Sequence, residues 1–371
     1  MRLAVGLALL YASVSSYSAL WPFMVERAGV DSASYGEFLS LGSILSVFVR
    51  YTSLLTNSLG WIALIGATFS ALSSSVLLAG YTYQTIFLST VLQRIGFSTS
   101  VMGRGMLTGM EVPETSKGLF TAGMISAGQV GMILGVNLGL LLFFLSGSYT
   151  QALLACIALS ALSVILLYPW LKERLSRNRL TLRLLIPKGG RVGRLVLVSC
   201  LDAFVWGGVF GFVFVLAPSY LGASEADIGL ARTLMVGLMI PLNVAFGLLS
   251  DRLRMRKGLL IFSELVGSVS LLYYALCPAP LTIVIFGLLM GVVASSWGPV
   301  ILAFFTELAK KEELGEVLSS WSVLTGVSRT IYPIVGGALI SRFGIPFFFE
   351  LSSVLLLGVT ASIGLLVREP R

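Results

Sequence analysis

The chain has 371 residues, of which 56% are apolar and 11% charged, and its mean hydropathy is +0.95. A soluble domain carries about a quarter charged residues and could not hide this much apolar surface, so the composition excludes a water-soluble globular protein. The net charge of +8 comes mainly from short connectors between apolar runs, which argues against a nucleic-acid-binding surface.

Twelve apolar runs follow one another, each long enough to cross a hydrocarbon core about 30 Å thick as a helix. Gly, Ser and Thr interrupt some runs, as membrane helices tolerate. The first run resembles a signal peptide but continues to Pro22, so we expect it to be retained as a span. The predicted spans are 3–22, 34–55, 60–81, 84–107, 117–146, 149–171, 194–221, 227–250, 258–277, 281–305, 316–341 and 346–367.

Basic residues are distributed unevenly among the connectors. Counted from a cytoplasmic N-terminus, nineteen lie on the cytoplasmic side, and only Arg27 and Arg342 lie on the other side. Basic connectors remain on the cytoplasmic side of a membrane. We therefore predict an integral protein of the cell membrane with both termini in the cytoplasm.

The longest connector, 172–193, is basic and lies midway along the chain. A weak repeat accompanies it, because 112–123 and 309–320, 197 residues apart, are each a charged turn, a Gly and a helix of small residues. Repeated halves are a common transporter plan. The sequence thus predicts an all-α membrane protein with twelve transmembrane helices in two pseudo-symmetric six-helix bundles. The predicted domains are the N-terminal bundle 1–171, the cytoplasmic linker 172–193 and the C-terminal bundle 194–371.

Three stretches resemble the major facilitator superfamily. Residues 247–257 contain a Gly, then Asp-Arg, then a basic cluster, similar to the cytoplasmic loop signature of that superfamily. The charged turns at 114–118 and 312–315 resemble the turns before its fifth and eleventh helices, and 333–337 resembles its Pro-x-x-Gly-Gly motif. The resemblance implies the major facilitator fold and a loop that latches one transport state, formed by Gly247, Asp251, Arg252, Arg256 and Lys257.

Three features depart from the superfamily pattern. In the fourth span, Arg94-Ile-Gly96 only partly matches the Arg motif of the superfamily, because the Gly comes early. The first-half counterpart of the loop, 50–60, has no Asp and no basic cluster. The fifth span resembles the glycine pattern of drug exporters but has Met132 in place of the expected Pro. Its glycines are Gly128, Gly131, Gly135 and Gly139.

Three charged residues lie well inside predicted spans: Arg94, Asp202 and Arg329. A charge there costs about 2.5–3.5 kcal/mol on insertion scales, so each needs a partner or a function. The resemblance places all three on or near one aqueous cavity. The arginines would attract an anionic group of the substrate, and Asp202 would be a proton or cation coupling site. The alternative is that Asp202 pairs with an arginine and locks helices together.

Several uncharged residues are weaker candidates for the cavity. Tyr11 and Ser15 belong to a polar first span, where hydrogen bonding between helices is the alternative role. Trp206 and Trp297 could contact substrate, although aromatic residues in membrane helices more often pack. Glu264 is interpreted as a partner of the basic loop 251–257 rather than a ligand.

No enzymatic site is recognisable. The chain has no His, and Cys156, Cys200 and Cys277 are scattered without metal-ligand or disulfide spacing. No nucleophile with a base and no phosphate-binding loop is present, so we expect no catalytic residues, cofactor or metal.

The sequence therefore predicts a secondary active transporter that moves a small solute by alternating access and is coupled to protons. Drug or metabolite efflux and organic-anion transport both stay open, as do symport and antiport. The expected partners are a small-molecule substrate, protons and the lipid bilayer, but no nucleic acid, and the chain is expected to be monomeric. The alternative is a non-transporting membrane receptor or scaffold that retains the transporter fold.

Overall fold

The structure is a computed structural model that describes residues 2–56, 59–107, 114–171, 190–253, 255–309 and 314–368. All regular structure in these ranges is helical, and nine of the helices found there are long and apolar enough to cross a membrane. The predicted all-α membrane protein is thereby confirmed. The number of twelve spans stays a prediction, and most of the predicted linker lies outside the described residues.

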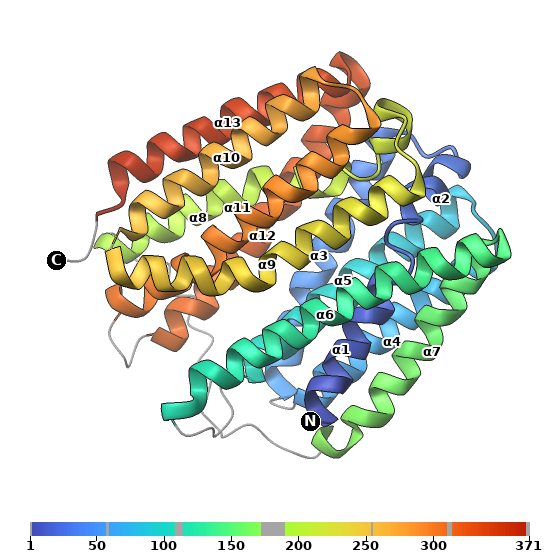
Figure 1. The fold of residues 1–371 in the computed structure, drawn as a ribbon, viewed down its shortest axis with the longest axis horizontal. Coiled ribbons are helices and arrows are strands. Elements are labelled where there is room, and N and C mark those ends of the chain that lie inside the picture. Colours follow the sequence, from blue (N-terminus) through green and yellow to red (C-terminus); the bar gives the residue numbers. More distant parts are fainter. Residues whose placement is uncertain are drawn as a thin grey trace. The chain divides into compact units, whose positions relative to one another are not determined.

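The helices form two compact units (Figure 1). Unit 1 comprises 1–31, 41–179 and 224–233, and unit 2 comprises 32–40, 180–223 and 234–371. The helices of unit 1 are α1 (Arg2–Ser15), α2 (Trp21–Arg27), α4 (Leu59–Leu78), α5 (Tyr83–Leu107), α6 (Glu114–Ser146) and α7 (Tyr149–Leu167), followed by a 3-10 turn (Tyr168–Leu171). Those of unit 2 are α8 (Gly190–Phe212), a π turn (Ala217–Leu221), α10 (Arg256–Leu276), α11 (Pro280–Leu308), α12 (Leu314–Phe343) and α13 (Ile345–Leu366). Two helices, α3 (Ser32–Thr56) and α9 (Glu225–Leu253), have residues in both units.

The first predicted span, 3–22, is not one continuous helix. Helix α1 ends at Ser15, and five residues of turn precede α2. The Ser16 and Ser18 hydroxyls each donate to the carbonyl three residues earlier, at 2.8 Å, which offers the backbone an alternative to the helical ladder. Pro22 then fits the start of α2, where its missing N–H is not needed.

The glycines of α6 pack against α1. A methyl group added at Gly131 or Gly135 would collide with the backbone carbonyl of Ala8 or Ala12, respectively. Four residues further along, Gly139 faces the Ser16 carbonyl in the same way. Close backbone approach at small residues is how membrane helices associate without a hydrophobic driving force. The glycine pattern therefore has a packing role inside unit 1.

The Pro-x-x-Gly-Gly stretch of α12 has a similar role in unit 2. A methyl group at Gly36 of α3 would collide with the Pro333 carbonyl, and one at Gly337 would collide with the Ser32 carbonyl. Gly336 faces a different neighbour, the Phe348 ring of α13. This motif thus lets α12 pack tightly against the first turns of α3.

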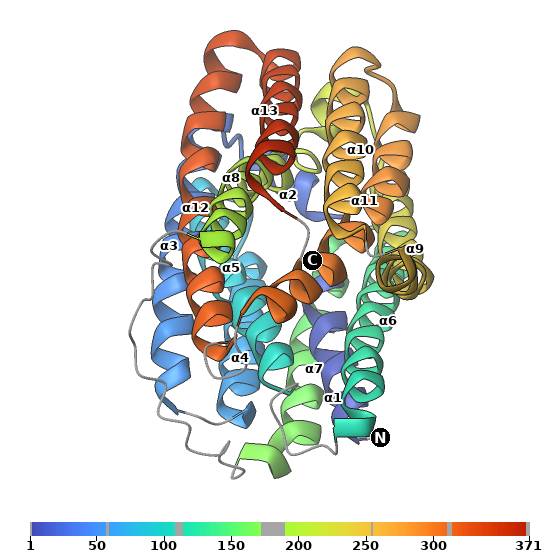
Figure 2. The same cartoon turned by 90° about the vertical axis from the view of Figure 1, so that its left-hand side faces the viewer.

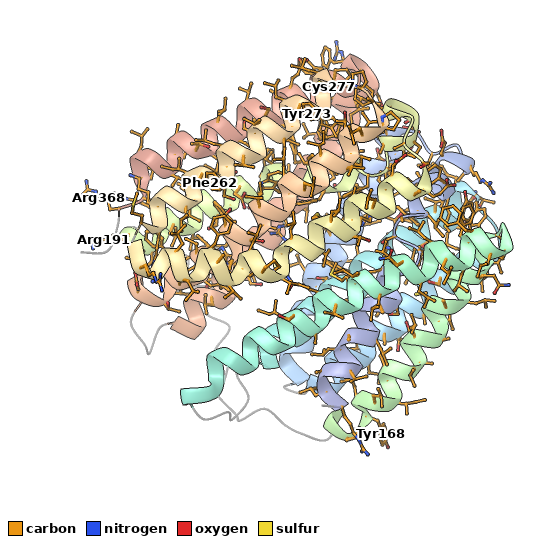
Figure 3. The ribbon with its side chains drawn as sticks, viewed as in Figure 1. Tyr168, Arg191, Phe262, Tyr273, Cys277 and Arg368 are labelled. Atoms are coloured by element: carbon orange, nitrogen blue, oxygen red, sulfur yellow. The ribbon has the colours of Figure 1, made fainter. Side chains whose placement is uncertain are left out.

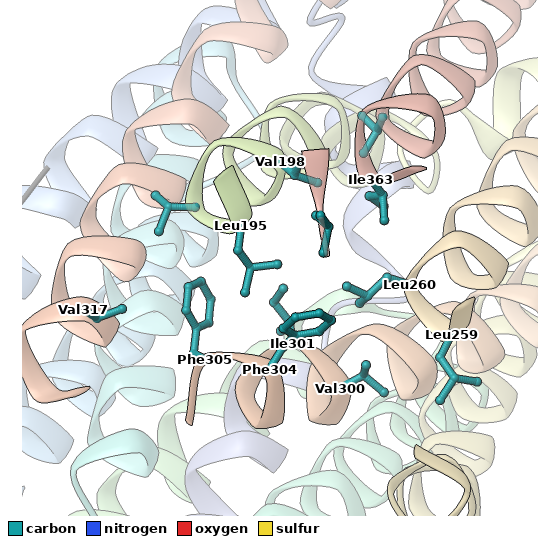
Figure 4. Close-up of a cluster of buried hydrophobic side chains, with 13 residues drawn as sticks. Leu195, Val198, Leu259, Leu260, Val300, Ile301, Phe304, Phe305, Val317 and Ile363 are labelled. Carbon is teal, nitrogen blue, oxygen red and sulfur yellow. The ribbon is translucent and has the colours of Figure 1, made fainter. Parts of the chain in front are cut away.

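Unit 2 encloses a hydrophobic core contributed by α8 and by α10 to α13 (Figure 4). Helix α8 lies beside α12 and α13, and α10 lies beside α13 and α11 (Figures 1 and 2). Helices α8 and α10 thus share α13 and α11 as neighbours. The buried residues of the core are Leu195, Val196, Val198, Leu259, Leu260, Val300, Ile301, Phe304, Phe305, Val317, Val359, Ile363 and Val367.

The two ends of unit 2 differ in charge. Figure 3 shows Arg191, near the start of α8, and Arg368, after α13, at one end of the unit. Cys277, which follows α10, lies at the opposite end. This arrangement fits the predicted separation of basic and non-basic connectors. The sidedness of the termini in the membrane stays a prediction.

Candidate functional site

Asp202 is a buried carboxylate on α8, with 6% of its surface exposed. Arg329 of α12 attracts it electrostatically, although the two do not form a direct ion pair. The helices meet closely because α8 has Gly207 at this level, where an added methyl carbon would lie 2.7 Å from the Arg329 Cα atom. The glycine therefore brings the Arg329 backbone to within about one and a half turns of Asp202 along α8.

Glu264 of α10 lies beside Asp202. Its side chain is fully buried, and Asp202 and Trp206 of α8 are near enough to influence its carboxyl group electrostatically. Within the described part of the chain, neither Glu264 oxygen makes a hydrogen bond of ordinary geometry. Three helices of unit 2 thus contribute to one polar cluster within an apolar interior. We call Asp202, Trp206, Glu264 and Arg329 the acidic cluster.

The interpretation of Glu264 as a partner of the basic loop is wrong. Arg256 of that loop pairs instead with Glu307 of α11, with 2.5 Å between Nη2 and Oε1. Lys257 donates to the Gly364 carbonyl at the end of α13, also at 2.5 Å. Glu264 lies eight residues after Arg256, which is about 12 Å along a helix. It is therefore two turns inside the unit and out of reach of the loop.

Trp206 is packed as well as polar. It is 7% exposed, its ring centroid lies 5.2 Å from that of Phe210, and Gly267 of α10 leaves room for its six-membered ring. An added methyl carbon at Gly267 would lie 2.7 Å from Trp206 Cζ2. Trp206 therefore fills the space between α8 and α10 and interacts there with the Glu264 carboxyl. Its predicted contact with substrate stays a prediction.

The two arginines have different surroundings. Arg329 is exposed at the surface of unit 2. Arg94 lies on α5 in unit 1, where it is half-buried and Gly42 of α3 faces its Cβ and Cγ atoms. Arg94 thus belongs to unit 1 and Arg329 to unit 2. That both line one cavity stays a prediction.

The remaining cavity candidates lie mostly in packed surroundings. Tyr11 is 2% exposed, with its ring against Gly128 of α6, and Ser15 is also buried. Trp297 of α11 is half-buried and packs against the core of unit 2. These positions suit helix packing, which was the alternative role for Trp297, whereas the alternative for Tyr11 and Ser15 was hydrogen bonding between helices.

The loop signature is described in part. Gly247 of α9 has open space around it, and Arg252 in the last turn of α9 is exposed. Asp251 belongs to the same turn, but its side chain lies outside the described part of the chain. The side chains of the charged turns at 114–118 and 312–315 lie outside it as well. Arg256 and Lys257 attach the loop to α11 and α13 of their own unit.

The sequence did not reveal Glu307 as a partner of this loop. Glu307 is an acidic residue in the last turn of α11, at the end of an apolar run. Glu307 and the 251–257 basic cluster lie at the same end of unit 2, and this shared position could have indicated the pairing from the sequence.

Residues 195–371 match the family model of the Major Facilitator Superfamily. A search of curated proteins finds no match to the sequence. Solved structures with the same fold include the human organic anion transporter MFSD10, with 16% identity, a TM-score of 0.70 and 98% of each chain covered. The nucleoside transporter NupG has 15% identity and a TM-score of 0.75 over 98% of each chain. A bacterial homolog of the human lysosomal transporter Spinster has 11% identity and a TM-score of 0.73, over 100% of this chain and 96% of that one.

Proposed function

Because residues 195–371 match the family model of the Major Facilitator Superfamily, we propose that the chain is a member of it, a secondary active transporter that moves a small organic anion in a proton-coupled cycle. The acidic cluster of unit 2 carries this proposal. A buried charge is costly in an apolar interior, and unit 2 keeps two buried carboxylates there, with the exposed Arg329 close to Asp202.

The internal repeat shows that the scaffold does not require these charges. At the offset of 197 residues, Asp202, Glu264 and Arg329 correspond to uncharged residues of the first half. If the charges only fastened helices together, apolar residues of similar volume would serve as well or better. A function in solute or proton binding explains their presence. The corresponding residues are Val5, Ala67 and Met132.

The arginines support an anionic substrate. A guanidinium stays charged and binds a carboxylate or phosphate through two parallel hydrogen bonds. The competing argument for drug export rested on the glycine pattern of α6 and on the aromatic residues of the span 194–221. The glycines of α6 pack on α1, and aromatic residues of α8 pack on neighbouring rings, as Trp206 does on Phe210 and Phe212 on Phe348. What remains to indicate the substrate is Arg94 in unit 1 and Arg329 in unit 2.

The proposed transport cycle is alternating access between two six-helix halves, 1–171 and 194–371, joined by the cytoplasmic linker 172–193. The loop 247–257 would latch one state of the C-terminal half. Asp202 would bind the coupling proton. The rival function, a receptor or scaffold without transport, predicts no ligand-dependent stabilisation of the protein.

A thermal-shift screen of purified protein separates these functions. Bound ligand stabilises the folded state by mass action. We expect carboxylates and phosphate esters to raise the melting temperature more at pH 5.5 than at pH 7.5, and Arg329→Gln to remove the effect. Arg342→Gln is the matched control, because Arg342 lies in the last turn of the same helix and stacks on Phe343.

Hits are then tested for transport in proteoliposomes. An inwardly directed or outwardly directed pH gradient should drive accumulation of a stabilising anion. Stabilisation by organic cations alone would contradict the anion assignment, and ligand binding without flux in either gradient would favour the receptor.

A further inference from the structure

We propose that the first turns of α9 form a latch that opens during transport, whereas the first turns of α3 form a fixed pivot. This inference rests on the proposed function for its role in transport. The contacts themselves lie inside the two units, because unit 1 includes 224–233 of the second half of the sequence and unit 2 includes 32–40 of the first half. Each unit thus holds the start of one helix from the other half.

The internal repeat relates the two contacts. A methyl group added at Gly337 of α12 would collide with the Ser32 carbonyl of α3. At the offset of 197 residues, Ser32 corresponds to Gly229 of α9. Gly337 corresponds to Leu140 of α6 at the same offset. Gly229 and Leu140 also contact each other, since a methyl group added at Gly229 would collide with the Leu140 side chain. The two contacts are therefore equivalent in the repeat, and their chemistry can be compared directly.

Backbone atoms make the contact of α3 with α12, which we call the α3 pivot. Gly36 of α3 faces the Pro333 carbonyl. Gly337 of α12 faces the Ser32 carbonyl in the opposite direction. Neither glycine has a side chain that could rearrange, and close backbone approach of this kind holds membrane helices together. The contact therefore suits a pivot, at which two helices stay together while the rest of the protein moves.

Side chains make the contact of α9 with α6 and α7, which we call the α9 latch. Glu225, Gly229 and Thr233 recur at intervals of four residues and so lie on one face of α9. The Tyr149 hydroxyl of α7 donates to Glu225 Oε1 at 3.4 Å. The Asn137 side-chain amide of α6 donates to the Thr233 hydroxyl at 3.1 Å. The α9 latch is therefore held by polar side chains, whose bonds can be broken and made again.

Both sides of the α9 latch keep their own structure when it opens. The Asn137 amide also donates to the Ile133 carbonyl of its own helix at 2.8 Å, so it stays bonded without α9. On the other side, Ser224 and Asp227 cap the start of α9 by themselves. The Asp227 carboxylate accepts from the Ser224 backbone N–H at 2.9 Å, and the Ser224 hydroxyl accepts from the Asp227 backbone N–H at 3.3 Å. Opening therefore breaks bonds between helices and leaves the helices themselves intact.

Tyr149 is held in place by groups of α2, α4–α5 and α6 rather than by α9. The Arg27 guanidinium lies over its ring, with 4.6 Å between Cζ and the ring centroid. The Phe143 ring stacks on it at 4.9 Å, and the Tyr81 ring meets it edge-on at 5.8 Å. These cation–π and ring contacts fix the phenol before α9 arrives. The bond to Glu225 is therefore the part of this cluster that departure of α9 would break.

The difference between the two contacts predicts an asymmetric movement. A symmetric movement of the two halves would separate both repeat-related contacts. If the α3 pivot stays closed, the halves instead rotate about it, and α9 withdraws from α6 and α7. The loop 247–257 lies at the other end of α9 and has no basic counterpart in the first half. Movement of α9 would then release the latch at one of its ends and engage the loop at the other.

Thiol labelling of purified protein tests this movement without any substrate. In the background protein, Cys200→Ser and Cys277→Ser remove the two partly exposed thiols and leave the buried Cys156. Leu140→Cys reports on the α9 latch, and Ser40→Cys, which is 1% exposed in the wild-type chain, reports on the α3 pivot. A small charged methanethiosulfonate should label Leu140→Cys and leave Ser40→Cys unlabelled.

Loosening the α9 latch should accelerate one reporter only. Tyr149→Phe and Thr233→Val each delete one hydroxyl of the latch. Each should raise the labelling rate of Leu140→Cys about fivefold, the factor that corresponds to one hydrogen bond of ordinary strength. The rate at Ser40→Cys should not change. Thr150→Val is the matched control, because Thr150 is an exposed threonine in the first turn of α7.

Each rate decides one part of the proposal. No labelling of Leu140→Cys, or a rate unchanged in both latch variants, would overturn the α9 latch. Equal acceleration of Ser40→Cys would overturn the α3 pivot, since both contacts would then open together. The two latch variants change different helices, so either one tests the proposal if the other does not fold. Rates as expected, combined with no flux in vesicles, would preserve the latch and reject the transporter assignment instead.

Discussion

Arg256 and Glu307 form an ion pair that joins the first turn of α10 to the last turn of α11. The arginine side chain is 10% exposed and the glutamate side chain 41%, so the pair lies at the rim of unit 2. Its neighbour Lys257 binds the carbonyl of Gly364 in the last turn of α13. A cation at a helix C-terminus satisfies its free carbonyls and complements its dipole. Two adjacent basic residues thus attach three helices to one another.

Glu307→Gln should lower the free energy of unfolding by about 1 kcal/mol, because a half-exposed ion pair is partly screened by solvent. Thermal melts in detergent measure the change, with Glu37→Gln as the control. The charge-exchanged double variant, Arg256→Glu with Glu307→Arg, should recover part of the loss. If the stability lost in the double variant equals the sum of the losses in the two single variants, the two side chains do not interact directly.

Gly131→Ala should be among the most destabilising single-methyl changes in unit 1. The added carbon would collide with the backbone of Ala8, which cannot move without displacing α1, and overpacking typically costs about 1–3 kcal/mol. Gly358→Ala on α13 is the matched control, because an added methyl group there meets open space. Alanine favours helix over glycine by about 1 kcal/mol, so the control should be neutral or stabilising. Similar folded yields for the two variants, measured by size-exclusion chromatography, would contradict the packing role.

Ser268 and Ser353 fasten α10 to α13 by reciprocal hydrogen bonds. Their hydroxyl oxygens lie 2.8 Å apart, and each hydroxyl is also within 3.0 Å of the other residue's carbonyl oxygen. Ser268→Ala should destabilise unit 2 by about 0.6 kcal/mol, the average for a hydrogen bond between membrane helices. Ser362→Ala is the control, because this exposed serine of α13 bonds only within its own helix. No difference between the two melts would mean that the pair adds nothing to the association of these helices.

Tyr81, in the connection between α4 and α5, should make unit 1 sensitive to alkaline pH. Burial raises the pKa of this phenol above its ordinary value of 10.0, and nearby Arg27 partly offsets the rise. The unfolded chain therefore ionises Tyr81 at a lower pH than the folded protein does. Its contribution to stability is fully present below pH 10 and is lost as the pH rises from there through the folded-state pKa. Tyr81→Phe should flatten the decline in melting temperature above pH 10, and an unchanged decline would contradict this assignment.

The sequence predicted charges in apolar surroundings better than it predicted their partners. Asp202 and Arg329 stand out because a charge inside an apolar run is costly, and the structure brings them close together in unit 2. Glu264 was assigned to the wrong partner because proximity to the basic loop in sequence suggested contact. Glu264 lies eight residues after Arg256 along the helix, at a level where Trp206 of α8 fits against Gly267 of α10. Such contacts between distant segments are not encoded in local spacing.

The packing partner of the α6 glycines was likewise not identified from the sequence. In the sequence these glycines indicated only a resemblance to the glycine pattern of drug exporters. The partner became evident only from the structure, although α1 has small residues at the same spacing, Ala8, Ala12 and Ser16. The break in α1 was also missed, because hydropathy does not distinguish a serine that faces a neighbour from one that bonds to its own backbone. A comparison of small-residue spacing between the predicted helices would have identified α1 as the partner of α6.

The position of Cys277 provides a natural reporter of membrane sidedness. Cys277 is half-buried at the end of unit 2 that lies opposite Arg191 and Arg368, whereas Cys156 is fully enclosed by its neighbours. If the basic end faces the cytoplasm, a membrane-impermeant maleimide added to intact cells should label the protein, and Cys277→Ser should abolish that labelling. Labelling that requires broken cells would reverse the assigned orientation. The native thiols therefore allow topology to be measured without introducing any new cysteine.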